Sequence, residues 1–310
     1  MTSTTQGKGH SFVHGLMFLT IFLVAFSFPV GAAITHALPP EVLMFIRFLM
    51  ASVFFAPYVF IKNGFQLPKL KSLLGYMVLS IPLVVFFWCM FESLRFTTAL
   101  NTGALYTTVP AITAVFAFFI NKVNTGKLRS LGLLLGTLGA LWIVFRGDIN
   151  GLLNLEFNSG DLIFLVGCLF MGAYNPLVKK IYVGEPMEVM TFWVIFMATL
   201  LLFILSLDNL DQVHWLAVES QVYLGLAFLA IFTTLFSFFV LQMATVKIGA
   251  TKVAAYGFLT PIMVIALSAV LGDRVDGWSI APGVILVLLA MLLINGEKYF
   301  RLTIRTEAAS

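Results

Sequence analysis

Apolar residues run along this chain in long, almost uncharged blocks that short polar connectors separate. Between Phe12 and Pro40 there is no Asp, Glu, Lys or Arg. A helix needs about 20 apolar residues to cross a membrane. The blocks are continuous, whereas the strands of a membrane barrel alternate, so we predict ten membrane-spanning helices. They lie at about 12–37, 41–61, 71–93, 97–120, 128–146, 160–182, 188–207, 220–244, 249–271 and 279–297.

The second half of the chain repeats the first in two ungapped matches. A shift of 151 residues lays 99–145 on 250–296, and a shift of 147 residues aligns the helices that precede these stretches. Each shift pairs a proline with a proline, which chance similarity between apolar helices seldom does. Paired positions include Pro29 with Pro176, Glu41 with Glu188, Pro110 with Pro261 and Gly132 with Gly283.

Each expected repeat holds five helices, an odd number, so the second repeat enters the membrane inverted relative to the first. We place the repeats at 12–146 and 160–297, with cytoplasmic tails at 1–11 and 298–310. With the N-terminus inside, fourteen connector Lys and Arg residues face the cytoplasm and three face out. Because cytoplasmic loops are rich in Lys and Arg, we predict a multi-pass protein of the plasma (inner) membrane with both termini cytoplasmic. The three outward residues are Arg95, Arg146 and Arg274.

Composition fits the same fold class, an all-α membrane protein surrounded by lipid. The 310 residues are 60% hydrophobic and only 10% charged, with a mean hydropathy of +1.02, whereas soluble domains carry roughly 25% charged residues. The net charge of +4 comes from basic residues scattered through the connectors, which predicts no nucleic-acid partner. Cys89 and Cys168 lie inside apolar runs and are interpreted as small buried hydrophobes rather than a disulfide or metal site.

The chain also lacks the motifs of most enzymes. No cluster of His, Asp or Glu has metal-binding or acid–base spacing, and no Gly-rich phosphate loop with its Lys is present. We therefore predict no catalytic residue, no metal and no cofactor. Inverted repeats in a membrane protein are instead typical of transporters, whose substrate site lies near the membrane midplane between the repeats.

An ordered set of motifs carries a family resemblance. The junctions LRFTTALNTGAL (94–105) and TVKIGATKVAAY (245–256) are each followed by a mid-helix proline, Pro110 or Pro261, and then by a Gly-rich fifth helix. The patch EVLMFIRFLMA (41–51) adds an early Arg-Phe segment. In this order the motifs resemble the drug/metabolite transporter superfamily, specifically its bacterial EamA-type ten-helix members.

The resemblance covers about 12–297 and implies export of small organic metabolites, among which amino acids are common. It also implies a central cavity lined by helices 1, 3, 4, 6, 8 and 9. Family members often carry an acidic residue after the fourth helix of a half. Asp273 fits this pattern, but the first half has Asn121 and Lys122 there, so no role is carried over to Lys122.

Arg47 is the most informative side chain, because a charge in the hydrocarbon core is expensive and usually faces a cavity or a partner. It lies inside the second helix, and Val194 occupies the equivalent position of the second half. One interpretation is a cationic anchor for a carboxylate or an acidic gate. The other is a side chain that extends toward the outer headgroups.

Other polar and aromatic residues within the helices are candidates for the cavity. Glu92 is either a proton site or a rim residue satisfied by Arg95 or Arg47, and His14 and His36 are expected at the membrane interfaces. Tyr174 and Asn175 precede Pro176, where a proline leaves a backbone carbonyl without its helix bond. The predicted cavity set is Arg47, Trp88, Glu92, Asn101, Tyr106, Thr107, Tyr174, Asn175, Gln242 and Tyr256. The predicted hinges are Pro29, Pro110, Pro176 and Pro261.

Three functions are compatible with such a chain: a secondary transporter, a membrane-embedded transferase and a non-transporting assembly protein. The repeats and sparse polar groups favour a transporter that works by alternating access on a small-molecule substrate. Proton antiport and facilitated diffusion both remain open. Gly132 and Gly136 permit close helix contact, either within the chain, which we favour, or as the seam of a homodimer.

Overall fold

The computed structural model describes residues 3–65, 67–123, 126–150, 158–270 and 277–307, and every element in these ranges is a helix. Short 3-10 and π segments interrupt or join the α-helices. The α-helices are α1 (Ser3–Ala25), α2 (Ser27–Ile34), α3 (Pro40–Asn63), α4 (Leu70–Ser93), α5 (Ala99–Tyr106), α6 (Val109–Asn121), α7 (Lys127–Val144), α9 (Ser159–Ile181), α10 (Met187–Leu210), α11 (Ser220–Phe228), α12 (Ser237–Ile248), α13 (Ala250–Ala255), α14 (Thr260–Val270) and α15 (Gly277–Glu307). The 3-10 helices are η1 (Trp215–Ala217) and η3 (Tyr256–Leu259), and η2 (Leu229–Phe236) is a π-helix.

Ten segments of the described residues are long and apolar enough to cross a membrane, which confirms the predicted all-α fold class with ten spans. Their ends agree with the prediction to within about four residues. The fourth predicted helix began at 97, whereas α5 begins at Ala99, because the Thr98 side chain caps the helix by accepting a hydrogen bond from the Asn101 backbone N–H. Arg274 and Asp273 lie outside the described residues.

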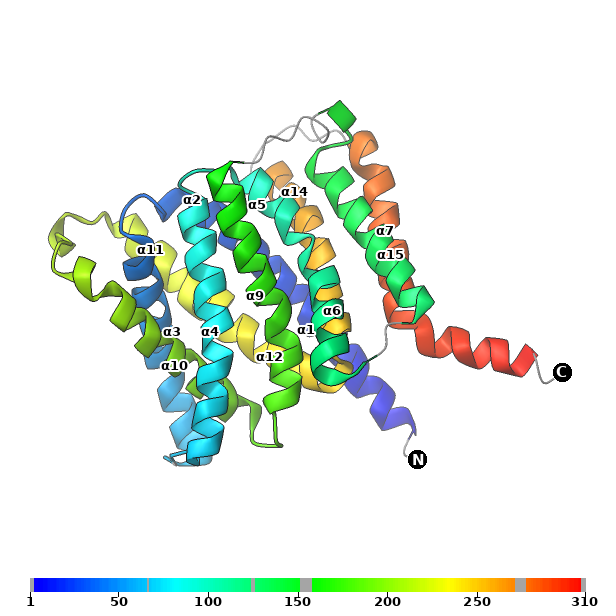
Figure 1. Cartoon of the computed structure of the whole chain (residues 1–310), viewed down its shortest axis with the longest axis horizontal. Helices are drawn as coiled ribbons and strands as arrows, with labels where there is room; N and C mark the ends of the chain where they lie inside the picture. Colours follow the sequence, from blue (N-terminus) through cyan, green and yellow to red (C-terminus); the bar gives the residue numbers. More distant parts are fainter. Residues whose placement is uncertain (1–2, 66, 124–125, 151–157, 271–276, 308–310) are drawn as a thin grey trace.

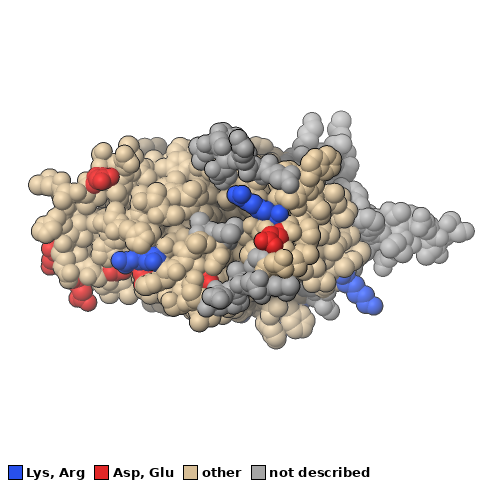
Figure 2. Space-filling model, turned by 90° about the horizontal axis from the view of Figure 1, so that it is seen from above, with Lys and Arg blue, Asp and Glu red and all other residues tan. Residues whose placement is uncertain are grey.

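The spans stand side by side in one bundle, with α3 and α10 at one edge and the pair α7 and α15 at the other (Figure 1). Both chain ends lie on the lower side of the bundle in this view. Among the described residues, the end face seen from above is mostly uncharged, with a few Lys, Arg, Asp and Glu side chains scattered over it (Figure 2). Large apolar side chains such as Ile61, Leu224 and Trp278 are exposed on the surface, as expected where lipid rather than water is the solvent.

Four spans are broken rather than continuous. The first consists of α1 and α2, and the fourth of α5 and α6. The eighth contains the π-helix η2, and the ninth contains the 3-10 helix η3. In the fourth span, Pro110 has no N–H for the carbonyl of residue 106, and the Thr107 and Thr108 hydroxyls donate to the Ala104 and Leu105 carbonyls. Side chains that bond the local backbone compete with the helix, so the chain breaks there.

The glycine-rich face of α7 packs within the chain. A Cβ added at Gly139 would lie 2.7 Å from the carbonyl oxygen of Gly283 in α15, and one added at Gly132 would lie 3.1 Å from the Ala290 carbonyl oxygen. A Cβ at Gly136 would lie 2.4 Å from the Phe258 ring in η3. Of the two interpretations of Gly132 and Gly136, intramolecular packing is therefore the one that the structure adopts.

Gly139→Ala is accordingly expected to destabilise the protein by about 1–3 kcal/mol, the usual cost of overpacking a tight interface. The added methyl meets backbone rather than a flexible side chain, so the two helices must separate. Thermal unfolding in detergent measures the effect. Gly15→Ala is the matched control, since nothing lies within 4 Å of a Cβ there. An equal melting temperature for the two variants would contradict the assigned role of this helix contact.

At the opposite edge, α3 and α10 run antiparallel and touch through polar groups along their length. Near the middle, the Ser52 and Thr199 hydroxyls are 3.0 Å apart and hydrogen-bonded. At one end, Lys62 Nζ lies 2.8 Å from Glu188 Oε1. At the other end, Asn209 Nδ2 donates to Glu41 Oε1 over 2.5 Å. This pair of helices is therefore held at three levels across the bundle.

Candidate functional site

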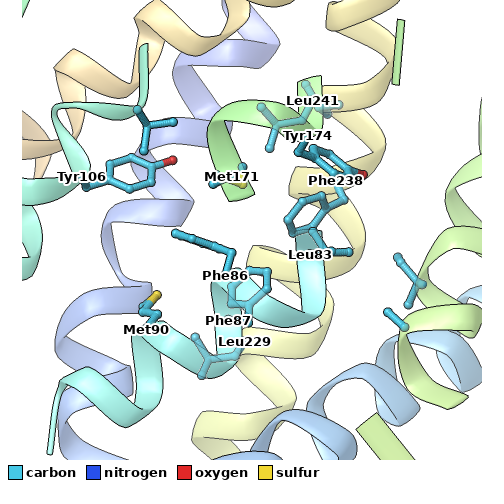
Figure 3. Close-up of a cluster of buried hydrophobic side chains, with 14 of the residues drawn as sticks. Leu83, Phe86, Phe87, Met90, Tyr106, Met171, Tyr174, Leu229, Phe238 and Leu241 are labelled. Carbon is cyan, nitrogen blue, oxygen red and sulfur yellow. The ribbon is translucent and has the colours of Figure 1, made fainter. Parts of the chain in front are cut away.

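A small interior cavity of about 30 Å³ lies between helices from both halves of the chain. Its walls are mainly aromatic and apolar, and Figure 3 shows several of these side chains gathered in the interior. Such walls with a few polar groups are typical of small-molecule sites. The main apolar lining residues are Phe28 from α2, Phe86 and Phe87 from α4, Tyr106 from α5, Met171 from α9 and Phe238 from α12.

The polar groups of the wall are hydroxyls. Ser27 begins α2, Thr233 lies in η2, and Ser237 begins α12. The Thr233 hydroxyl donates to the Leu229 carbonyl, and the Ser237 hydroxyl donates to the Phe232 carbonyl, five residues earlier. No carboxylate, Lys or Arg stands among the lining residues in the described part of the chain. The wall itself is therefore uncharged.

Arg47 lies directly behind this wall and is fully buried. Its Nε donates to the Thr234 hydroxyl and its Nη2 to the Thr233 hydroxyl, each over 2.7 Å. The guanidinium carbon also lies 4.3 Å from the centre of the Phe87 ring, a cation–π contact. The side chain thus turns into the bundle and does not extend to the outer headgroups, which was the second of the two sequence interpretations.

The π-helix η2 provides both hydroxyl partners of Arg47 from consecutive residues, Thr233 and Thr234. π-helical turns are rare and occur frequently at functional sites. A tight chain of side chains therefore joins α3, η2 and α4 at one wall of the cavity. The Thr-Thr pair was a signal that the sequence offered, since a buried arginine needs acceptors, but sequence alone did not place it opposite Arg47.

A second buried polar group joins α9, α10 and α12. Gln242 Nε2 donates to the Tyr174 hydroxyl over 2.8 Å, and the Thr191 hydroxyl donates to Gln242 Oε1 over 2.5 Å. Beside it, the Thr245 hydroxyl donates to Asn175 Oδ1 over 3.3 Å. These predicted cavity residues do not line the cavity. Their polar groups hydrogen-bond within this buried group instead. The Tyr174 ring packs edge-on against Phe238 of the wall.

The remaining predicted cavity residues are spread over the bundle. Only Tyr106 of the predicted set lines the cavity, and Thr107 is buried at the break of the fourth span. Asn101 Nδ2 donates to Asp161, and Tyr256 bonds the His14 ring. Trp88 is 37% exposed on the surface. Glu92 lies 3.6 Å from Arg95, the rim arrangement that was one of its two interpretations.

Three of the four predicted hinge prolines lie beside a break in a span, and the fourth, Pro176, lies inside a continuous helix. Pro29 is in α2, just after the break at Phe26, and Pro110 and Pro261 stand in the first turns of α6 and α14, each after a break. Pro176 lies inside α9, and its own carbonyl accepts a hydrogen bond from Asn121 Nδ2. Pro110 and Pro261 thus occupy equivalent places in the two broken spans.

No group of three or more His, Cys, Asp or Glu that could hold a metal ion occurs among the described residues. Cys89 and Cys168 are buried free thiols. The arrangement offers instead an apolar cavity, a few hydroxyls and one buried cation. Such an arrangement is suited to binding a small organic molecule.

Comparison with known proteins bears on this arrangement. The model of the EamA-like transporter family matches residues 11–145 and again residues 158–296. The chain belongs to the EamA-like transporter family. It is therefore a transporter and a multi-pass protein of the plasma membrane. Its partners are accordingly a small-molecule substrate and the membrane lipid.

Proteins that resemble this chain include two named as uncharacterized transporters. YyaM of Bacillus subtilis is 26% identical over 253 residues, which cover 81% of this chain and 82% of that protein. A protein of Archaeoglobus fulgidus is 27% identical over 286 residues, 90% of this chain and 96% of its own. A crystal structure with 16% sequence identity matches 91% of this chain and 96% of its own with a TM-score of 0.72, which shows the shared fold.

Proposed function

We propose that this EamA-like protein is a secondary transporter that exports small organic metabolites, such as amino acids, by alternating access around the interior cavity. The position of the cavity supports the proposal best. Val24, Phe87 and Tyr106 come from the first stretch that matches the family model, and Met171 and Phe238 come from the second. A movement of one half against the other therefore reshapes the cavity.

Contacts between equivalent positions support the inverted repeat on which the mechanism depends. Ser52 and Thr199 are equivalent under the 147-residue shift and bond each other. Tyr106 and Gly257 are equivalent under the 151-residue shift, and a Cβ on Gly257 would lie 3.5 Å from the Tyr106 ring. Contacts of this kind arise where a two-fold axis passes between two similar halves.

The glycine contacts between α7 and α15 at the other edge also occur in pairs related by the repeat. The 151-residue shift converts the contact of Gly132 with Ala290 into the contact of Gly283 with Gly139, and the structure contains both. We therefore propose repeats at 12–146 and 160–297, related by an axis in the membrane plane. Two halves that can exchange conformations are the usual basis of alternating access. With the connectors' basic residues inside, both termini are cytoplasmic.

Solute counterflow in proteoliposomes tests the function directly. Vesicles are loaded with one unlabelled metabolite at a time, and uptake of the same labelled compound is followed with and without a pH gradient. We expect accumulation of at least one member of a panel of amino acids and organic acids, and none in protein-free vesicles. A dependence on the gradient would identify proton coupling. No exchange of any member by folded, inserted protein would contradict the proposal.

Pro29, Pro110 and Pro261, each beside a break, and Pro176 inside α9 are the proposed hinges. Replacing Pro29, Pro110, Pro176 and Pro261 together by Ala restores backbone N–H groups and favours continuous helices, so we expect impaired turnover with normal membrane insertion. Counterflow measures the rate, and protease protection of the termini reports insertion. Pro57 and Pro82, which lie inside α3 and α4, form the control pair. Exchange at the wild-type rate by the fourfold variant would rule out the hinge role.

A further inference from the structure

The buried charge of Arg47 has no ionic partner among the described residues. The two ion pairs found there join Lys62 to Glu188 and Arg95 to Glu92. Glu41, at the start of the same helix, accepts from Asn209. Two threonine hydroxyls and the Phe87 ring surround the guanidinium without neutralising it. Removing one partner of a buried charge pair is strongly destabilising because it leaves an uncompensated charge, so a fold that keeps a lone cation at this place requires an anion from elsewhere.

One nitrogen of the same guanidinium has unused bonding capacity. Nη1 is buried and has no hydrogen-bond partner among the described residues, whereas Nε and Nη2 are both satisfied. Buried donors without partners are rare in folded proteins. A guanidinium presents its N–H groups in a fixed fork that matches a carboxylate. The vacant donor is thus suited to a single anionic oxygen, with the hydroxyls already holding the plane of the group.

The guanidinium is one side-chain layer from the cavity. Phe87 and Thr233 both contact Arg47 and both line the cavity. The remaining wall near them is apolar, with Phe86, Met90 and Phe238. A ligand whose charged end reaches past Phe87 would place its other end against these apolar side chains. No lining residue carries a negative charge that could hold an ammonium group.

We infer that the substrates of this transporter are small organic monoanions with an apolar or aromatic body, and that Arg47 Nη1 binds their anionic group once the Phe87 ring moves aside. The inference rests on the proposed transport function and narrows its substrate class. A zwitterion such as a free amino acid meets the same cation but leaves its ammonium group buried without an anionic partner, which is costly. Arg47 therefore selects by charge, and the aromatic wall selects by shape.

The test compares three ligands of similar shape on the full-length protein: phenylacetate, phenylacetamide and phenylalanine. Binding is measured in detergent as the ligand-dependent rise in melting temperature, since a ligand that binds the folded state stabilises it in proportion to its affinity. Bonds to a charged group predict an affinity for phenylacetate about 10-fold to 100-fold greater than for the amide. Equal affinity for phenylacetate and phenylacetamide would overturn the inference without any variant.

Substitution then assigns the selectivity to Arg47. Arg47→Met keeps most of the volume and removes the charge, and apolar replacement of buried ions is often tolerated, so the fold should persist. We expect the preference for phenylacetate over phenylacetamide to fall to about 1-fold, because the remaining wall is uncharged. Arg95→Met, at the exposed pair with Glu92, is the control and should keep the preference. A preference that survives Arg47→Met would overturn the inference.

Counterflow of the same three compounds separates this inference from the transport function. Exchange of phenylacetate and related arylalkyl carboxylates, with little exchange of phenylalanine, supports both. Exchange of phenylalanine or the amide at the same rate as the acid overturns the anion inference and leaves transport intact. Binding of phenylacetate without exchange of any compound supports the anion site and contradicts the transport proposal.

Discussion

Joining Lys62→Cys and Glu188→Cys with a short reducible dithiol cross-linker is expected to reduce solute exchange to the level of protein-free vesicles. In the wild-type protein these two side chains join the ends of α3 and α10 by an ion pair of 2.8 Å. The 147-residue shift converts this contact into the one between Asn209 and Glu41 at the opposite end. Both contacts are formed in this structure, so we expect alternating access to separate the first contact in one state and its counterpart in the other. A covalent bridge at one end removes one of the two states.

The matched control is a bridge on the proposed axis. Ser52 and Thr199 are equivalent to each other, so their contact is converted into itself when the halves exchange conformations. A disulfide between Ser52→Cys and Thr199→Cys should therefore leave exchange largely intact. Both double variants are made after replacing the two native cysteines, Cys89 and Cys168, by Ala. Counterflow before bridging, after bridging and after reduction gives the measurement.

The comparison of the two bridges decides the mechanism. Full activity with the bridge between positions 62 and 188 would contradict alternating access through separation of α3 and α10. Loss of activity with the axis bridge, restored by reduction, would show that α3 and α10 slide where the symmetry requires a fixed contact. Either result would leave the family membership and the fold untouched, because these rest on the sequence match and on the ten spans.

Sequence predicted the spans well, because a membrane helix must satisfy two simple conditions, length and apolarity. Both can be counted along the chain. The irregular places inside the spans were harder. Pro110 and Pro261 predicted the broken fourth and ninth spans, since each removes a backbone donor. Nothing comparable marks the π-helix η2, whose sequence LAIFTTLF has no proline or glycine. Its geometry depends on what packs against it, including Arg47.

The residues that line the cavity were harder still to predict from the sequence. Arg47 was visible in the sequence because a charge stands out in an apolar run. Phe86 and Phe87 were not, because a phenylalanine that faces a cavity and one that faces lipid have the same composition signal. Trp88, their neighbour, was selected for its indole and instead lies at the surface. In a soluble protein, the polar face of a helix shows which side chains face the solvent. In a membrane protein, the lipid-facing and interior faces are both apolar, so the sequence does not show which way a phenylalanine points.

Several polar candidates lie outside the lining of this cavity for a related physical reason. A buried amide or hydroxyl must find a partner, and Gln242, Tyr174 and Thr191 find one another. The hydrogen-bonding groups that made Gln242 and Tyr174 candidates therefore also let them be satisfied inside the packing between α9, α10 and α12. The sequence shows that a buried polar side chain needs a hydrogen-bond partner, but it does not show which group is that partner.

Ser27→Leu provides the second test of large expected effect, since it fills the cavity rather than locking the halves. Ser27 lines the cavity and is 4% exposed. Its equivalent under the 147-residue shift is Tyr174, a much larger residue that is fully buried, so the repeat accommodates bulk at this position. Filling a cavity with apolar atoms commonly stabilises a protein by about 0.5–2 kcal/mol. We expect an unchanged or raised melting temperature in detergent together with loss of exchange.

Stability and transport should thus move in opposite directions, which separates a blocked cavity from a damaged fold. Ser27→Ala, which keeps the space open, is the control and should exchange at a rate close to that of the wild-type protein. Ser27→Leu protein that melts at a higher temperature and still exchanges solute normally would contradict the proposed role of the cavity in transport. A stabilised protein would then have its cavity filled while the solute crossed by another route, and the aromatic wall around Phe86, Phe87 and Tyr106 would be packing alone.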